Sequence, residues 1–445
     1  MPTVEDRGGR RSVQTRAETR KELKREMPLR PPMPTTDVVV VGAGPSGSTL
    51  AYHLAKKGWS VTLLEEHPLI GRPVQCAGLV SQRVLDMAGT SKMVQRPMGG
   101  AIVWGPSMGK IEFAAGETRA HVISREMLDF LLAERAARAG VQVLTGWKFK
   151  DIRERPNTPD GKVVLGAESP TGPAELTTRL LVGSDGVAST VARKLRLRRP
   201  IEILPAFEAD LPFRDAPQDQ VEIYLGRDLA PGFFGWSIPD GEGNVRVGVG
   251  LNARNGLLAL DGYRELVRRM ERRYGRKLPS PIRTIVSGIP VGQIPVISTD
   301  HGLLVGDAAA QVKPLSGGGI FTGMRAAELA AGVASAALEE GNLSAQRLRE
   351  YDRQWAHEMG DEMDRALFFR RLFVQLSDAD LDRLLEVLKE SKLISTIVAF
   401  GDIDFPTLTI RELLGQSPSL VHLFPKALSA FFRRKRGLAP DVLAG

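Results

Sequence analysis

The chain contains a single cysteine, Cys76, among its 445 residues. One cysteine excludes an internal disulfide framework and any zinc site built on cysteines, and it fits a reducing, cytoplasmic location. None of the six histidines has the spacing to a second histidine and an acid that a metal site needs, so we expect no metal. No apolar run reaches the roughly 18 residues that span a bilayer. The charged first 36 residues contain no secretory signal.

The overall composition has no strong bias. The net charge of +8 is moderate and does not argue for a nucleic-acid partner. Hydrophobic residues make up 42% of the chain and charged residues 25%, as in ordinary globular proteins, and the length allows two or three lobes. Residues 1–36 mix basic and acidic residues with prolines and show no apolar periodicity, which predicts a disordered basic tail.

The most informative feature near the start is a glycine-rich turn between a predicted strand at 38–41 and a predicted helix at 46–57. In the pattern Gly42-x-Gly44-x-x-Gly47, the first glycine makes a tight turn and the second lets the backbone approach a pyrophosphate. The third lets helix and strand pack closely, and the helix start, with Pro45 and Ser46, offers amide donors to phosphates. This pattern predicts a dinucleotide site.

An acid at the end of the next strand supports that prediction. Residues 60–65 continue the βαβ unit, and Glu65 ends the strand where an acid is expected to meet a ribose hydroxyl. We include Glu65 and its neighbour Glu66 among the predicted cofactor-binding residues.

A second motif lies about 260 residues later, where the parallel-strand pattern returns at 303–305. Gly306 and Asp307 follow that strand, and the carboxylate can accept a hydrogen bond from a ribityl hydroxyl. The glycines of the next loop can turn their amides toward a flavin or its phosphates. Together the two motifs indicate FAD, bound in extended form across a discontinuous domain. The loop residues of the predicted site are Pro314, Gly317, Gly318, Gly319 and Ile320.

Two elements between these motifs are ambiguous on their own. Arg125 stands ahead of an amphipathic helix predicted at 125–139, where an arginine is commonly solvated. Asp185 and Gly186 follow a short predicted strand at 180–182, where they can form an ordinary turn. We include all three residues in the predicted cofactor site.

The pattern changes near residue 200. Alternating stretches at 221–225 and 245–249 predict a half-exposed antiparallel sheet. We therefore expect a mixed α/β fold with a Rossmann-like FAD-binding domain, an antiparallel-sheet substrate domain and a helical C-terminal region. The predicted boundaries are 37–200 with 290–340 for the FAD-binding domain, 201–289 for the substrate domain and 341–445 for the helical region.

The order of these motifs resembles the fold of the FAD-dependent hydroxylase superfamily. Within it, residues 36–400 most resemble the geranylgeranyl reductase family, including archaeal digeranylgeranylglycerophospholipid reductases. The resemblance implies an FAD-dependent enzyme that saturates isoprenoid double bonds of a geranylgeranyl-type lipid: a membrane lipid, a quinone or a prenyl precursor. The matching segments are 73–76, 231–239, 241–243, 302–307, 314–320 and 376–381.

Two departures from the family pattern lie where the family contacts substrate. Phe234 and Ile238 replace a tyrosine and a phenylalanine of the family's aromatic stretch, so the tyrosine hydroxyl is absent. Residues 77–79 read Ala-Gly-Leu where relatives often carry an acid between glycines. Substrate identity is therefore less determined than cofactor identity.

The candidate substrate-side residues each have a plain structural alternative. Cys76 follows the second strand on a segment that approaches the flavin in this fold, where a thiol can donate a proton or tune the site, or it is a small buried hydrophobe. Phe233, Phe234 and Trp236 can line an apolar prenyl tunnel or simply pack in the core.

The predicted partners are a prenyl lipid and an external electron donor. No second nucleotide motif is present, so the donor is a transiently bound nicotinamide such as NADPH, a ferredoxin or a deazaflavin. Residues 421–437 carry five basic residues, no acid and several apolar ones, which favours peripheral contact with the cytoplasmic face of a membrane over plain solvation.

Two other functions share these motifs. Monooxygenases of this fold usually carry histidine where this chain has Ala310. The stretch Phe234-x-Trp236-x-Ile-Pro resembles one of halogenases, but this chain has no lysine near residue 79 to match the catalytic lysine of that family. A flavoprotein used only for electron transfer or lipid binding is the remaining alternative.

Overall fold

The computed structural model describes residues 35–253, 256–417 and 420. The predicted tail at 1–36 lies outside the described residues except for Thr35 and Thr36, which begin the first strand. The predicted membrane-contact segment at 421–437 also lies outside them.

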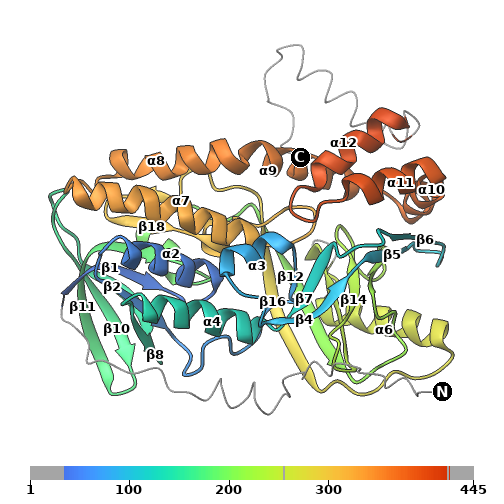
Figure 1. Cartoon of the computed structure of the whole chain (residues 1–445), viewed down its shortest axis with the longest axis horizontal. Helices are drawn as coiled ribbons and strands as arrows, with labels where there is room; N and C mark the ends of the chain where they lie inside the picture. The colour runs from blue at the N-terminus through green and yellow to red at the C-terminus, as the bar shows by residue number, and fades with distance from the viewer. Residues whose placement is uncertain (1–34, 254–255, 418–419, 421–445) are drawn as a thin grey trace, which may run out of the picture.

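One lobe of the molecule, here called the first half, is built on an eight-stranded sheet (Figure 1). Its strand order is β17-β18-β11-β1-β2-β8, with β10 attached to β11 and β9 attached to β10. β11 pairs in parallel with both β1 and β18, so the early and late parts of the chain lie in one sheet. The strands are β1 (Thr35–Val41), β2 (Val61–Glu65), β8 (Gln142–Thr145), β9 (Lys148–Glu154), β10 (Val163–Ser169), β11 (Gly172–Gly183), β17 (Ser298–Thr299) and β18 (Gly302–Leu304).

Three helices pack together against this sheet and bury its central strands. α2 (Pro45–Lys56) contacts both α4 (Arg125–Arg138) and α7 (Ile320–Glu339). Val38, Val39 and Val40 are completely buried, as expected for a central parallel strand that is covered on both faces. Two short helices complete this part of the fold: α5 (Thr190–Leu195) and the 3-10 turn η2 (Gly306–Ala309).

The second half contains a seven-stranded sheet with the order β16-β12-β15-β14-β13-β5-β6. It is not confined to residues after 200, because its last two strands come from 100–114 and join β13 in parallel register. Its strands are β5 (Gly100–Trp104), β6 (Lys110–Ala114), β12 (Glu202–Leu211), β13 (Gln220–Tyr224), β14 (Gly235–Pro239), β15 (Val245–Gly250) and β16 (Arg283–Val291).

The predicted half-exposure of this sheet is wrong for β15, all six of whose residues are buried. One face of the sheet packs on α6 (Ala259–Tyr274) through Leu266 and Met270, both fully buried. The other face lies against an internal cavity rather than solvent. The alternation at 245–249 therefore separates two buried environments.

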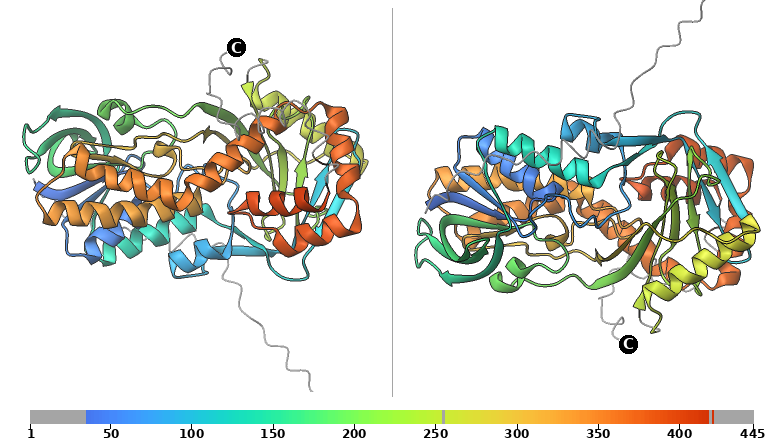
Figure 2. Two further views of the ribbon diagram at one scale, coloured as in Figure 1. Left: turned by 90° about the horizontal axis from the view of Figure 1, so that it is seen from above. Right: turned by 90° about the horizontal axis from the view of Figure 1, so that it is seen from below.

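A small sheet and a set of C-terminal helices join the two halves. The small sheet comprises β3 (Leu79–Val80), β4 (Val94–Met98) and β7 (Ala120–Ile123), beside α3 (Gln82–Ala88). In the views from above and below, the C-terminal helices run from the first sheet across to the second (Figure 2). They are α8 (Ala345–Trp355), the π-helical turn Ala356–Gly360, α9 (Asp361–Phe373), α10 (Asp378–Leu388), α11 (Ser391–Phe400) and α12 (Pro406–Gln416). Within the described residues, no helix combines the length and apolarity that crossing a membrane requires.

Because α6 supports the back of the second sheet, Leu266→Ala is expected to destabilise the protein by about 2–5 kcal/mol through loss of apolar contact and formation of a cavity. Leu258→Ala, at a side chain that is 65% exposed, serves as the control and should have little effect. Urea denaturation of both variants checks this. Equal midpoints for the two would show that α6 does not support the sheet as described.

Candidate active site

The three glycines of the turn between β1 and α2 have two different roles. Gly42 has φ +100°, and a Cβ atom there would lie 2.3 Å from the carbonyl oxygen of Ser184. A Cβ atom on Gly47 would lie 2.0 Å from the carbonyl oxygen of Gly42. A Cβ atom on Gly44 would meet nothing within 4 Å. The first and third glycines therefore allow chain packing, while the second borders open space that suits a pyrophosphate.

Two helices begin side by side at this open space. α2 starts at Pro45 and α7 at Ile320, and neither has a side chain capping its first turn. The Ser46 hydroxyl lies between them and the late strand, because a Cβ atom on Gly323 would lie 2.3 Å from Ser46 Oγ and one on Gly306 2.5 Å from it. The amide groups of both helix starts are thus available to an anion.

Glu65 lies against the glycine turn at the end of β2. Its carboxylate accepts hydrogen bonds from the backbone N–H groups of Ala43 at 3.1 Å and His67 at 3.0 Å. Glu66 has a different environment. It is paired with Lys148 at 2.7 Å and is about half exposed, so it belongs to a surface ion pair rather than to the turn.

Asp307 combines partial burial with an unpaired carboxylate. It follows β18 within η2, and among the described residues its carboxylate has no hydrogen-bond partner. Burial raises the pKa of Asp307, and the positive charge of Arg125 opposes that rise. Gly319 packs so closely that a Cβ atom there would lie 2.8 Å from Asp307 Oδ1. A carboxylate left open in this position suits a ribityl hydroxyl, so these residues fit FAD.

The loop from Gln311 to Gly319 is held by side chains that the sequence did not single out. Gln311 accepts a hydrogen bond from the Gly306 N–H at 2.7 Å and donates one to the Tyr351 hydroxyl at 2.8 Å. The Thr322 hydroxyl donates to the carbonyl oxygens of Gln311 and Gly319. Within the loop, Pro314 is buried and Gly317 has φ +70°.

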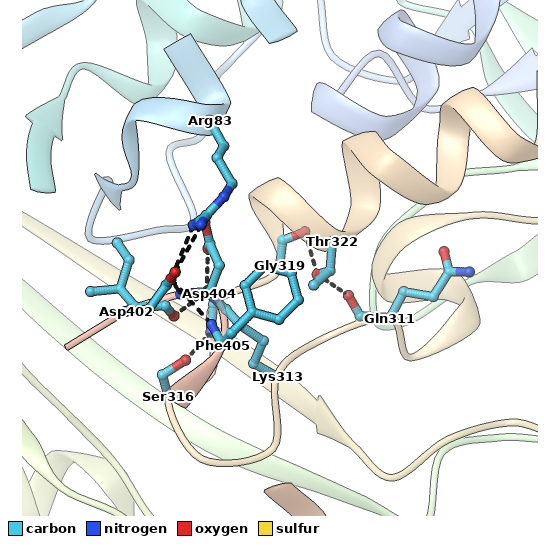
Figure 3. Close-up of polar contacts among 11 residues, drawn as sticks. Arg83, Gln311, Lys313, Ser316, Gly319, Thr322, Asp402, Asp404 and Phe405 are labelled. Carbon is cyan, nitrogen blue, oxygen red and sulfur yellow. Dashed lines mark hydrogen bonds and ion pairs between the residues drawn. The ribbon is translucent and has the colours of Figure 1, made fainter. Parts of the chain in front are cut away.

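The same loop is tied to the C-terminal helices through Lys313. Its ammonium group donates to Asp404 Oδ1 at 2.8 Å and to the Ile403 carbonyl at 2.7 Å (Figure 3). Arg83, from α3, pairs with Asp402 at 2.8 Å and with Asp404 at 3.2 Å. Lys313 and Asp404 are almost fully buried. No local sequence signal could have paired Lys313 with an acid 91 residues away.

Arg125 connects the cofactor side to Cys76. It begins α4, which is capped by the Ser124 hydroxyl, and its guanidinium contacts both carboxylate oxygens of Asp129 at 3.1 Å. Burial lowers the pKa of Arg125, but Asp129 and the Cys76 sulfur raise it more strongly, so the net direction is upward. This arginine is therefore an internal cation beside the thiol and not a solvated helix-start residue.

Asp185 has mainly a structural set of contacts. Its carboxylate accepts hydrogen bonds from the Ser189 hydroxyl at 2.6 Å and from the Thr190 and Val191 N–H groups at 2.6 and 3.0 Å, so it caps α5. Gly186 has φ +71° and completes the turn. The sequence left open whether Asp185 and Gly186 form an ordinary turn or part of the cofactor site, and these contacts favour the turn. The turn holds Ser184 against Gly42.

A cavity of about 610 Å³ lies between the second sheet, the loop at 316–318 and the start of α12. It falls within the size range of small-molecule sites and is lined mainly by apolar side chains. All four predicted substrate-side residues line it: Cys76, Phe233, Phe234 and Trp236.

The aromatic residues of the cavity form one connected group. The rings of Phe233 and Phe234 stack with centroids 4.2 Å apart, and Trp236 meets Phe234 edge-on at 6.2 Å. Trp236 belongs to β14, whereas the two phenylalanines precede that strand. Phe233 also reaches the loop, because a Cβ atom on Gly317 would lie 3.0 Å from its ring. The cavity and the predicted flavin loop are therefore in contact.

The cavity also contains an acid that the sequence analysis missed. Glu208, on β12, lines it and is only 3% exposed. In the sequence it stands in an alternating strand, where an acid is normally read as facing solvent. Among the described residues, no cluster of three His, Cys, Asp or Glu side chains could hold a metal ion.

Comparison with known proteins agrees with this architecture. Residues 35–363 match the family described as FAD binding domain. Digeranylgeranylglycerophospholipid reductase 2 of Methanothermobacter thermautotrophicus is 36% identical over 394 residues, which cover 87% of this chain and 98% of the relative. The same enzyme type in Methanocaldococcus jannaschii is 32% identical over 400 residues, covering 88% and 98%.

Solved structures extend the likeness to three dimensions. A geranylgeranyl bacteriochlorophyll reductase-like protein of Thermoplasma acidophilum has a TM-score of 0.76 and 25% identity, covering 87% of this chain and all of that one. The predicted mixed α/β fold with an FAD-binding domain is thereby confirmed.

The open space at Gly44 gives a clean test of the cofactor site. Gly44→Val is expected to abolish FAD binding, because its side chain would fill the space without meeting other protein atoms. Far-ultraviolet circular dichroism should stay native while the flavin absorbance of the purified protein disappears. Gly332→Val is the control, since a Cβ atom there also meets nothing within 4 Å, its φ is not positive, and the residue is exposed on α7. Normal flavin content in the Gly44 variant would refute this assignment.

Proposed function

The chain belongs to the digeranylgeranylglycerophospholipid reductase family of proteins with an FAD-binding domain, and from this we propose that it reduces isoprenoid double bonds of a geranylgeranyl-type lipid. Its cofactor is FAD. The observation that carries the proposal is the cavity, which is apolar along most of its wall and is bounded at one end by Gly317 and Gly318 of the predicted flavin loop.

The protein's part in this reaction is to hold the cofactor and exclude water. Reduced FAD, when bound, supplies a hydride for one carbon of the alkene. The β1–α2 turn and the start of α7 suit the pyrophosphate, Glu65 suits the ribose, and Asp307 suits the ribityl chain. Gly186 and the glycine loop at 317–319 would approach the flavin side of the cofactor. Asp185 acts in this proposal by positioning the turn.

An isolated alkene offers no polar group by which it can be bound, so its position depends on the shape of an apolar wall. Phe233, Phe234 and Trp236 provide that wall next to the loop. The replacement of the family's tyrosine by Phe234 removes a hydroxyl from this surface and makes it more apolar. Such a lining favours a hydrocarbon chain over a hydroxylated aromatic substrate.

Cys76 lies where the cavity meets the Arg125 cation. Its sulfur accepts a hydrogen bond from the Gly78 N–H at 3.4 Å, which fixes the direction of the side chain. The residue is partly accessible and lines the cavity, which supports a role beyond core packing. We propose that the thiol contacts the reacting end of the lipid and tunes the local charge.

A reductase of this kind requires a lipid substrate and an external electron donor. We propose NADPH, a ferredoxin or a deazaflavin as the donor, and peripheral contact with the cytoplasmic face of a membrane as the route to the lipid. The basic composition of residues 421–437 supports such contact. So do the exposed apolar side chains of Phe400 (51%) and Leu408 (40%), on the two helices that border the cavity.

An anaerobic assay tests the proposed reaction. The chemically reduced enzyme is mixed with a geranylgeranyl phospholipid, and flavin reoxidation is followed together with the lipid mass. We expect a gain of two hydrogens for each flavin reoxidised, without oxygen. Products that form only when oxygen is admitted would favour the monooxygenase or halogenase alternative, which shares this fold.

Cys76→Ser should slow the single-turnover reduction of the lipid while FAD stays bound, because the smaller, less polarisable hydroxyl does not reproduce the sulfur contact. Stopped-flow absorbance of the flavin measures this rate. Ser395→Ala, at an exposed position on α11 that does not line the cavity, is the control and should react like the parent. An unchanged rate in the cysteine variant would return Cys76 to a packing role.

A further inference from the structure

Glu208 is the one glutamate among the residues that line the described cavity. β12 pairs with β15 on one side and β16 on the other, so Glu208 lies opposite Gly248 and Ile285. Its neighbours Phe207 and Ala209 face the opposite way and pack with the α6 core. Strand alternation thus places Glu208 on the cavity face of the sheet.

The carboxyl group of Glu208 is held by the indole ring of Trp236, which reaches over the strand that lies between them. Trp236 Nε1–H, from β14, donates a 2.7 Å hydrogen bond to Glu208 Oε2 on β12. The strand between them is β15, and its residue at this level is Gly248. A Cβ atom on Gly248 would lie 2.5 Å from the indole ring, so only glycine leaves room for this contact.

The second carboxyl oxygen has no such partner. Oε1 of Glu208 is buried and makes no hydrogen bond with any described residue. A buried carboxylate with one unpaired oxygen is unfavourable, and protonation removes its charge, so the neutral carboxyl is the less costly form at this position. A proton on Oε1 is therefore compatible with the indole donating to Oε2.

The surrounding charges act in both directions. Burial raises the pKa of Glu208 to about 7, and Asp210 adds to the rise, while Arg246, the Trp236 hydrogen bond and Arg283 lower it. The charged side chains that face the cavity from other elements are Arg119, Lys313 and Asp402. A carboxyl that titrates near neutrality can both deliver a proton and regain it from water.

We propose that Glu208 is the general acid of the reaction and protonates the alkene carbon next to the one that receives the hydride. This rests on the proposed function. The Glu208 O–H bond breaks and leaves its electron pair on the carboxylate, and the alkene π pair forms the new C–H bond to that proton. The hydride brings its own electron pair to the neighbouring carbon. The lipid is reduced by two electrons, the flavin is oxidised by two, and the carboxylate is reprotonated from solvent. Trp236 acts as a positioning residue by fixing Oε2.

The test compares Glu208→Gln with the parent holoenzyme. Glutamine keeps the size and the acceptor for Trp236 but has no acidic proton, so single-turnover lipid reduction should fall about 100-fold with FAD still bound. The parent rate should be constant below about pH 7 and fall tenfold for each pH unit above it, because the acid must be protonated. The rate of the variant should not show this fall above pH 7.

A readout independent of activity is the infrared carboxyl band in difference spectra of parent minus Glu208→Gln. It should show a protonated carboxyl that disappears near pH 7, and a band that instead titrates near the ordinary 4.5 would overturn the proposal. Trp236→Phe should move both the band and the fall in rate to higher pH, since it removes a donor that stabilises the carboxylate.

Asp210→Asn is the matched control, because Asp210 is an acid two residues along the same strand that does not line the cavity. It should react at close to the parent rate, and its rate should begin to fall at slightly lower pH, because the charge of Asp210 raises the pKa of Glu208. If the parent reduces the lipid and Glu208→Gln does so equally fast, the assignment of Glu208 is wrong while the reductase function stands. If the parent itself fails to reduce the lipid, the proposed function fails.

Discussion

The close approach of three backbone segments around Ser46 is the constraint on which the structure depends. Gly306 and Gly323 leave no room for a side chain against the Ser46 hydroxyl, and Gly42 leaves none against Ser184. Only glycine permits such contacts, at Gly42 and Gly306 with positive φ as well. The strand order makes them possible, because β11 pairs in parallel with both β1 and β18 and so sets the ends of early and late strands side by side. The predicted dinucleotide site, formed from residues about 260 apart, depends on that order and on the absence of side chains at these few positions.

The second sheet supplies the other wall, and its two faces have different tasks. Val245, Val247 and Val249 of β15 and Ala209 of β12 pack in the α6 core, while Ala206 and Glu208 of β12 line the cavity. A shift of one residue in the register of β12 would exchange its two faces, which would turn Ala209 toward the cavity and place Glu208 in the α6 core. The glycine at 248 matters for the same reason, since it lets Trp236 reach across β15. Packing on one face therefore determines which chemical groups are presented on the other.

Sequence reasoning succeeded where the rule is local. A glycine turn needs only a strand before it and a helix after it, and both lie within a few residues of their predicted bounds. It failed where the outcome depends on distant partners. The exposure of β15 was misjudged because α6 covers one face and the rings of Phe233 and Trp236 cover the other. β5 and β6 could not be assigned to the second sheet without the pairing of β5 to β13. Glu208 and Lys313 look like surface residues in the sequence. Their burial is set by Trp236, 28 residues away, and by Asp404, 91 residues away.

The ion pair between Lys313 and Asp404 links the cofactor side of the molecule to the cover of the cavity. Lys313 belongs to the predicted flavin loop, and Asp404 lies between α11 and α12, which border the cavity. Removing one member of a buried pair leaves the other charge unpaired, which costs about 3–5 kcal/mol. Withdrawal of Asp404 would impose that cost on Lys313, whereas Arg83 is about half exposed and can regain water. Opening the cavity at this end would therefore disturb the predicted flavin loop, so the cover of the cavity and the order of this loop depend on the same contact.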